Sequence, residues 1–181
     1  LSSHKPESPL SNLLADILLW GGNGFNENVD FALYNVGGIR AAFAKGTVTY
    51  GDVVDVAPFE NKICFLTLSG SKVRELFEEV AKLGGEGLSH GTNLVITRDG
   101  RLLDAKINGK DLDDKATYRV ATLDYLAQGN GGLDALKYGT AVVSPKGTDN
   151  NVRYIIMNYF RDKMAHGIAV DSKVEGRIVV R

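Results

Sequence analysis

The chain has 181 residues, 44% of them hydrophobic and 24% charged, and its 21 Lys and Arg nearly balance its 22 Asp and Glu. This size and composition indicate one globular domain, and the near-neutral charge excludes the basic surface with which proteins hold nucleic acid. A single cysteine, Cys64, excludes an intramolecular disulfide, three scattered histidines give no zinc-ligand spacing, and no apolar run approaches the roughly 18 residues that span a membrane.

The N-terminal part is predicted to be a short tail followed by a helix. Residues 1–7 are polar, so we expect them to form a flexible tail ahead of a single domain that spans residues 8–181. From Ser8 onward, leucine and isoleucine residues recur on one helical face, which predicts an amphipathic helix. Ser8 is suited to be its N-cap, Pro9 its first helical residue and Gly21 its end.

Apolar patterns predict the elements of the remaining chain, and Asp-Gly and Asn-Gly pairs predict tight turns at 99–100 and 108–109. The strongest pattern is an apolar stripe at 71–83 with charged residues opposite, which predicts a helix that covers the core. The strands around these turns predict an antiparallel meander. The expected elements are strands at 31–34, 62–68, 93–97, 101–107, 118–122 and 178–180, a short helix at 39–45, a turn or short helix at 51–56, and helices at 71–83 and 151–165.

A glycine turn between a buried strand and an expected helix start is the first candidate binding feature. Free backbone N–H groups at a helix start favour an anion or a polar ligand edge, and Gly37 and Gly38 let a ligand approach the backbone. Asn35 offers a donor and an acceptor that suit the edge of a base, and Arg40 offers several donors for phosphate or ribose oxygens. Taken alone, such a turn is more often an ordinary helix entrance with a surface arginine.

Two loops place an aromatic residue in irregular backbone next to a strand. Phe59 lies in the segment 57–61 before one strand, and Tyr125 lies in the segment 124–132 after another. If the two rings faced each other, a flat heterocycle could stack between them, with about 1–3 kcal/mol contributed by each face. The alternative is that both are ordinary core or rim aromatics and that the glycines within 129–132 form only a flexible turn.

Four motifs occur in a fixed order along the chain. They are Asn-x-Gly-Gly-Ile-Arg at 35–40, Pro-Phe-x-Asn at 58–61, Leu-x-Gly at 68–70 and Asp-Tyr-Leu-Ala-x-Gly at 124–129. Together they resemble the C-terminal, substrate-binding domain of the 5'-nucleotidase family, which includes periplasmic UDP-sugar hydrolases and ecto-5'-nucleotidases. The segments at 10–16 and 175–178 are similar to the first helix and the closing segment of that domain, so the resemblance covers nearly the whole chain.

The resemblance implies an α+β fold with a mixed β-sheet and packed helices, whose loops hold a nucleotide or nucleoside. By position, Phe59 and Tyr125 would clamp the base and Asn35 would contact it. Arg40 would face the phosphate or the ribose. The substrate-binding residues that the resemblance implies are Asn35, Gly37, Gly38, Arg40, Phe59, Tyr125, Gly129 and Asn130.

Two positions depart from the family pattern. The glycine loop of the family carries an aspartate that accepts hydrogen bonds from ribose hydroxyls, and Gly131 stands at that position here. Asn130 and Asp134 are the neighbouring residues that would have to replace it. An arginine that many members carry before the first helix is also absent, and Lys5 offers a less directional charge there.

The chain contains no counterpart of the metallophosphoesterase motifs with which family members hold two metal ions. The resemblance therefore implies that this chain binds no metal or other cofactor, and that divalent metal ions sit on a partner phosphoesterase domain or subunit. The function implied is nucleotide recognition for hydrolysis by that partner, in the periplasm or outside the cell, where family members are commonly exported. The alternative is a scaffold module of the same fold that has lost nucleotide binding, and a stand-alone Ser or His hydrolase has no motif behind it.

Overall fold

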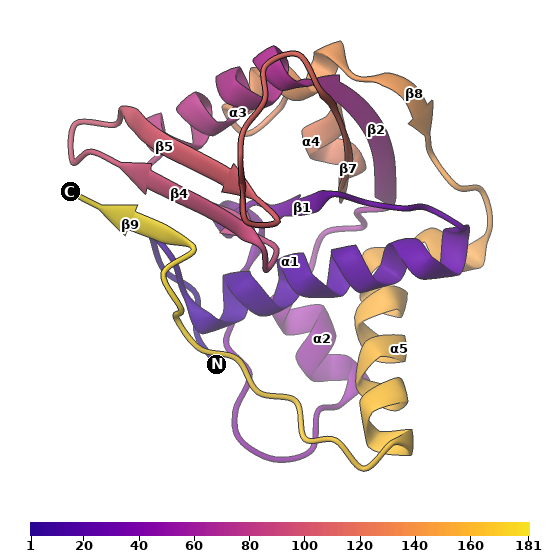
Figure 1. The fold of residues 1–181 in the computed structure, drawn as a ribbon. Helices are drawn as coiled ribbons and strands as arrows, with labels where there is room; N and C mark the ends of the chain where they lie inside the picture. The colour runs from indigo at the N-terminus through magenta and orange to yellow at the C-terminus, as the bar shows by residue number, and fades with distance from the viewer.

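The computed structural model covers residues 1–181 and arranges them as two mixed β-sheets with helices packed against them (Figure 1). This is the α+β fold with a mixed sheet and packed helices that the family resemblance implies, with the strands divided between two sheets. The helices are α1 (Pro9–Gly21), α2 (Tyr50–Val56), α3 (Gly70–Lys82), α4 (Asp124–Ala127) and α5 (Val152–Ala165), with 3₁₀ turns η1 (Gly22–Phe25), η2 (Val36–Gly38), η3 (Asp134–Tyr138) and η4 (Thr148–Asn150). The strands are β1 (Phe31–Tyr34), β2 (Ile63–Ser69), β3 (Gly87–Leu88), β4 (Thr92–Ile96), β5 (Leu102–Ile107), β6 (Lys110–Asp111), β7 (Thr117–Leu123), β8 (Thr140–Val143) and β9 (Ile178–Val180).

The five-stranded sheet has the order β3-β1-β7-β2-β8 and places three strand termini together. β1 runs parallel to β7, with Phe31 opposite Val120, and β2 runs antiparallel to β7, with Ile63 opposite Leu123. Because parallel strands end on the same side of a sheet, β1 and β7 end where β2 begins. The loops that follow β1 and β7 and the loop that precedes β2 therefore meet at one end of this sheet.

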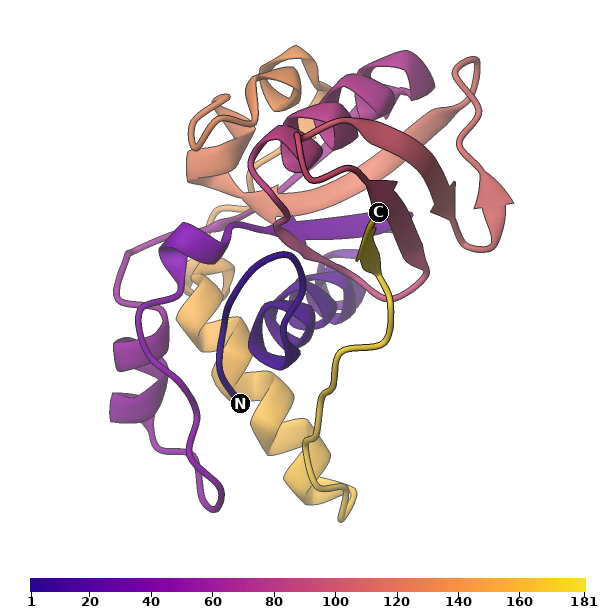
Figure 2. The same cartoon turned by 90° about the vertical axis from the view of Figure 1, so that its left-hand side faces the viewer.

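The four-stranded sheet has the order β6-β5-β4-β9, and the C-terminal strand β9 lies parallel to β4 in it (Figure 2). The sequence predicts that the strand at 118–122 continues the antiparallel meander of β4 and β5. The structure corrects this, because β7 crosses to the centre of the five-stranded sheet. Its last four residues are all buried, and a strand buried on both faces belongs inside a sheet.

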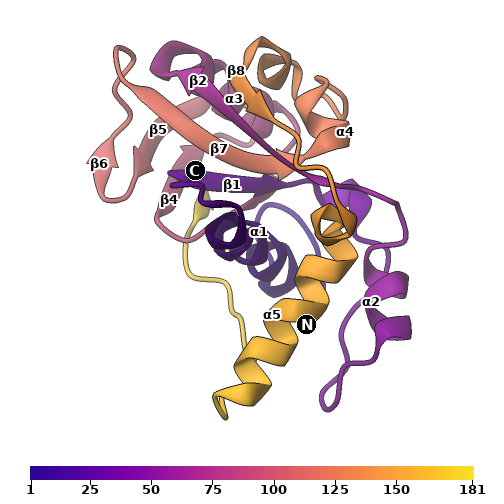
Figure 3. The same ribbon diagram turned by 90° about the vertical axis from the view of Figure 1, so that its right-hand side faces the viewer.

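Helices cover both faces of the five-stranded sheet. Figures 1 and 3 show α1 and α5 on one face, and α3 with α4 on the other. Side-chain caps fix the helix starts: Ser8 Oγ accepts the Ser11 N–H at 3.2 Å, and Ser69 Oγ accepts the Lys72 N–H at 3.3 Å. No helix is both long enough and apolar enough to cross a membrane.

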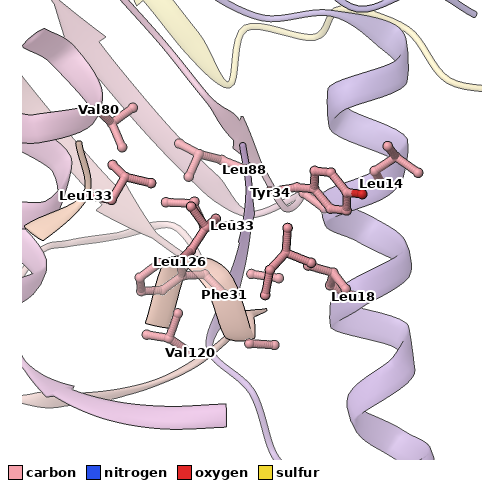
Figure 4. Close-up of a cluster of buried hydrophobic side chains, with 14 of the residues drawn as sticks. Leu14, Leu18, Phe31, Leu33, Tyr34, Val80, Leu88, Val120, Leu126 and Leu133 are labelled. Atoms are coloured by element: carbon pink, nitrogen blue, oxygen red, sulfur yellow. The ribbon is translucent and has the colours of Figure 1, made fainter. Parts of the chain in front are cut away.

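The core is built on both sides of β1, every residue of which is buried. Figure 4 shows Tyr34 pointing toward Leu14 and Leu18 of α1, while Leu33 points to the opposite side, where α3 contributes Val80. Successive side chains of a strand alternate between its two faces, so four residues are enough to join both helical layers. Apart from the helix expected at 39–45, the predicted elements form within one residue of their expected bounds.

The segment 1–7, expected to be a flexible tail, is packed into the domain instead. The Leu1 ammonium group donates a hydrogen bond to the Phe43 carbonyl at 2.6 Å. Glu7 is only 3% exposed, and its carboxylate accepts the backbone N–H of Glu175 at 2.8 Å. Ser2, His4 and Lys5 are exposed, whereas Glu7 is buried and hydrogen-bonded, and the sequence pattern does not distinguish these two situations.

No helix forms at 39–45, which corrects the second local expectation. Ile39 has an extended backbone with φ −99° and ψ 113°, and the Arg40 N–H donates to the Val56 carbonyl at 2.9 Å. Phe43 in the same segment is buried at 5% exposure. A backbone contact to α2 and a core anchor hold this segment in an irregular, non-helical conformation, so tertiary contacts override the local helical pattern.

Candidate functional site

A cleft of about 510 Å³ lies at the end of the five-stranded sheet where β1 and β7 end and β2 begins. Six of the eight residues predicted from the sequence line it: Asn35, Gly37, Gly38, Arg40, Phe59 and Tyr125. Five residues outside that prediction line it as well: Lys5, Asn61, Leu83, Glu86 and Gly131. The sheet topology thus brings together two loops that are distant in the sequence. Asn35 follows β1 and Tyr125, 90 residues later, follows β7, and these two strands are parallel neighbours that end on the same side of the sheet.

The two aromatic residues of the cleft are unusually exposed for their size. Phe59 is 46% exposed and Tyr125 is 45% exposed, although both lie beside strands whose residues are buried. Rings that completed the core would be covered, so both rings have a face available inside the cleft. Such faces are suited to stack on a flat heterocycle.

Asp124 connects the two loops that carry these rings. Its Oδ1 accepts the Lys62 N–H at 3.0 Å and the Tyr125 N–H at 2.9 Å. Its own N–H donates to the Lys62 carbonyl at 2.8 Å. The Asp124 side chain and its backbone N–H together join the start of α4, where Tyr125 lies, to Lys62, which follows the loop that carries Phe59.

The glycine turn forms a single 3₁₀ turn, η2, and no α-helix follows it. No helix dipole is therefore available to attract an anion here. The positive charge that could do so is the guanidinium of Arg40. Arg40 Nε donates to the Gly37 carbonyl at 2.8 Å, and its guanidinium lies 5.2 Å from the centroid of the Phe59 ring. The terminal nitrogens of Arg40 make no hydrogen bond within the chain and can donate to a ligand.

Close packing around Asn35 explains one of the glycines. A Cβ on Gly38 would come within 2.9 Å of Asn35 Oδ1, so a larger residue here would displace the Asn35 side chain. Asn35 Oδ1 is buried and has no hydrogen-bond partner in the chain. Because Oδ1 is sealed from solvent in this arrangement, Nδ2 is the part of the Asn35 amide that a ligand in the cleft can reach, and it makes no hydrogen bond in the chain.

The second glycine loop behaves differently from the prediction. Gly129 and Asn130 do not line the cleft, and Asn130 Nδ2 instead donates to the Tyr125 carbonyl at 2.9 Å. Asp134 pairs with Lys137 at 3.0 Å, outside the cleft. Neither candidate for the missing aspartate therefore offers its side chain to the cleft, where Gly131 adds backbone only.

Two charged residues outside the eight predicted site residues also line the cleft: Lys5, which stands where many family members carry an arginine, and Glu86. Glu86 is 4% exposed, and Lys5 Nζ lies 3.5 Å from its Oε1. Burial raises the pKa of the Glu86 carboxyl above its ordinary value, and the Lys5 ammonium offsets part of that rise. Lys5 also donates to the Leu83 carbonyl at 2.7 Å, so it holds the end of α3 as well as the carboxylate.

Of the residues that the sequence-based prediction missed, Asn61 had a visible signal, since it ends the Pro-Phe-x-Asn motif. Glu86 had none, because its position depends on β3, a strand of only two residues. The structure contains no group of three or more His, Cys, Asp and Glu side chains arranged to hold a metal ion.

Comparison with known proteins identifies a common architecture. The family model described as the 5'-nucleotidase C-terminal domain matches residues 1–138. The protein UshA of Yersinia enterocolitica is 37% identical over 106 residues, which are 57% of this chain and 19% of UshA. The trifunctional nucleotide phosphoesterase YfkN of Bacillus subtilis is 31% identical over an alignment of 187 positions that covers 95% of this chain and 12% of YfkN.

A solved structure extends the similarity to nearly the full length. The 5'-nucleotidase precursor of Thermus thermophilus superposes with a TM-score of 0.80 and 29% identity, covering 96% of this chain and 35% of that one. The chain thus spans a fifth or less of these two curated relatives, at 19% and 12%, and about a third of the solved protein.

Proposed function

Because this chain belongs to the 5'-nucleotidase C-terminal domain family, we propose that it is the nucleotide-recognition domain of a phosphoesterase whose catalytic domain lies outside the described residues. The observation that supports this best is the pair of half-exposed rings, Phe59 and Tyr125, on a cleft that also holds Asn35 and Arg40. Rings stack on a base, an amide reads its edge and a guanidinium binds phosphate, so the three chemistries of a nucleotide are matched.

The residues of the cleft suit substrate binding rather than catalysis, which assigns binding to this chain and the chemical step to the partner domain. Arg40 offers charged donors to a phosphate, and stacking orients the base, so the chain would hold the nucleotide while its phosphate ester is presented outward. Two divalent metal ions on the partner domain would activate water and polarise the phosphate. Hydrolysis of a 5'-phosphomonoester or a nucleotide diphosphate ester is the corresponding reaction. A location in the periplasm or outside the cell belongs to the same proposal and rests on family membership.

Isothermal titration with nucleosides and nucleotides tests the recognition role. Phe59→Ala and Tyr125→Ala are each expected to weaken binding about 5- to 150-fold, the equivalent of roughly 1–3 kcal/mol of stacking. Tyr138→Ala is the matched control, because Tyr138 is 53% exposed and lies outside the cleft. Phosphate release by this chain alone, with nucleotide and divalent metal, would contradict the division of labour.

One observation favours a second candidate function, a scaffold module without nucleotide binding. Gly131, Asn130 and Asp134 leave the cleft without the carboxylate that the family loop supplies. The same titration separates the two functions. Absence of binding by the wild-type chain, or unchanged binding in both alanine variants, would support the scaffold.

A further inference from the structure

The pairing of β3 with β1 places Glu86 at the wall of the cleft. β3 is antiparallel to β1, with Leu33 opposite Leu88 and Tyr34 opposite Gly87, so the next positions of this register are Asn35 and Glu86. The Val36 N–H lies 3.4 Å from Glu86 Oε1, which agrees with that placement. The carboxylate therefore lies beside the glycine turn, on the side of the cleft where Asn35 is found.

Comparison with Glu7 reveals that the Glu86 carboxylate is only partly paired, with both of its contacts on Oε1. Both residues are buried to the same degree, at 3% and 4% exposure. Glu7 accepts four N–H groups, from the Asn12 side chain at 2.8 Å and from the backbone of Glu175 at 2.8 Å, Gly176 at 3.1 Å and Ile178 at 3.3 Å. Glu86 Oε1 has one long N–H contact at 3.4 Å and a lysine at 3.5 Å, and its Oε2 accepts nothing.

The free oxygen of Glu86 is accessible from the cleft. Oε2 has no hydrogen-bond partner, yet it is absent from the few polar atoms that are both unpaired and sealed from solvent, such as Asn35 Oδ1. The rest of Glu86 is covered and the residue lines the cleft, so the cleft is the side from which Oε2 is reached. A carboxylate has about four acceptor positions, and the Lys5 and Val36 contacts occupy Oε1 alone, so Oε2 is left with free acceptor positions.

We propose that Glu86 is a ligand-binding residue whose Oε2 accepts hydrogen bonds from N–H or O–H donors on the nucleoside part of the ligand. This inference rests on the proposed nucleotide-binding function. An ionised carboxylate repels phosphate, so the phosphate lies on the Arg40 side and the donor-bearing part faces Glu86. The donors are either N–H groups of the base, read together with the neighbouring Asn35, or hydroxyls of the ribose, which Gly131 cannot bind through a side chain.

Titration with guanosine tests this, since guanosine carries both N–H and O–H donors. Glu86→Gln keeps the shape and removes the charge, and we expect about 10- to 150-fold weaker binding, as for hydrogen bonds to a charged acceptor. Glu78→Gln, which changes an exposed carboxylate on α3 outside the cleft, is expected to bind like the wild type. Titrating the wild type and Glu86→Gln with 2',3'-dideoxyguanosine then locates the donor. If the donors are the 2' and 3' hydroxyls of the ribose, the two proteins bind this ligand equally. If the donors are N–H groups of the base, the difference in affinity persists.

Thermal unfolding separates a binding role from a structural one. Glu7→Gln is expected to lower the Tm, because it disturbs four satisfied hydrogen bonds. Glu86→Gln is expected to leave the Tm unchanged or raise it, because Lys5 is 38% exposed and keeps its bond to Leu83. A Tm loss in Glu86→Gln as large as that in Glu7→Gln would assign Glu86 a structural role.

The outcomes also distinguish this inference from the proposed function. Guanosine binding that Phe59→Ala weakens and Glu86→Gln leaves intact would overturn the role of Glu86 while the recognition function stands. Absence of guanosine binding by the wild-type chain would overturn both.

Discussion

Replacement of Asp124 by alanine is expected to have two effects. It should loosen the loops that carry Phe59 and Tyr125, and it should lower the free energy of unfolding of the domain. The Asp124 side chain accepts two hydrogen bonds, from the Lys62 N–H at 3.0 Å and from the Tyr125 N–H at 2.9 Å. The variant Asp124→Ala loses both of them. The backbone bond from the Asp124 N–H to the Lys62 carbonyl, at 2.8 Å, is retained. The variant therefore removes the side-chain link and leaves the strand pairing of β2 and β7 in place.

The magnitude follows from the kind of bond that is lost. A hydrogen bond to a charged group contributes about 1.5–3 kcal/mol, and Asp124 is only half-buried, so two such bonds together contribute about 2–3 kcal/mol here. For a domain of this size, roughly 2–4 °C of Tm accompanies each kcal/mol, which gives a decrease of roughly 4–12 °C. Asp124→Asn retains an acceptor oxygen and loses the charge, so about half of that decrease is expected.

Thermal unfolding followed by circular dichroism measures this effect, and titration with a nucleotide measures the accompanying loss of affinity. Asp104→Ala is the matched control, because Asp104 is exposed on β5 and its side chain makes no hydrogen bond or ion pair. A Tm for Asp124→Ala within about 1 °C of the Asp104→Ala value would refute the assignment of Asp124 as the link between the loops. Reduced stability with unchanged nucleotide affinity would show that the link does not position the rings.

Two further predictions concern stability alone. Gly70→Ala places a Cβ 1.8 Å from the Asp113 carbonyl oxygen, so we expect a loss of about 3 kcal/mol or more in urea unfolding, whereas Gly24→Ala, with no atom within 4 Å, is expected to be nearly neutral. The hydrogen bond from Arg119 lowers the pKa of Glu27 below its ordinary value of 4.5, so the stabilising pair is fully present at neutral pH and is lost as the pH falls through the folded-state pKa. The stability difference between wild type and Glu27→Gln should accordingly be largest at pH 7 and shrink below about pH 4.5, and a pH-independent difference would contradict this.

Elements with a local cause could be predicted from the sequence. The helix α3 follows from an apolar stripe that includes Val73 and Phe77 and from the cap at Ser69, all of which lie within one short segment. The same holds for α1, whose N-cap and first proline are Ser8 and Pro9. In these segments local propensity and the final packing agree, so the pattern along the chain is sufficient.

Features that depend on distant pairing could not be predicted in this way. The segment 1–7 is held by bonds such as that from the Glu175 N–H to Glu7, which joins residues 168 positions apart. The segment 39–45 stays non-helical, with the Arg40 N–H donating to the Val56 carbonyl. Only the motifs around Asn35 and Tyr125, known from a family resemblance, indicated which loops meet, and the parallel pairing of β1 with β7 gives the physical reason.

Three acidic residues illustrate how hydrogen-bond satisfaction separates structural from binding roles. Glu7 and Glu86 are equally buried, and a sequence-based expectation would place neither of them inside. Glu7 and Asp124 have their bonds directed to backbone N–H groups of this chain, so folding alone accounts for them. Glu86 has an oxygen with no donor in the fold, and since native structures leave few polar groups unpaired, the missing donor is best sought in the molecule that enters the cleft.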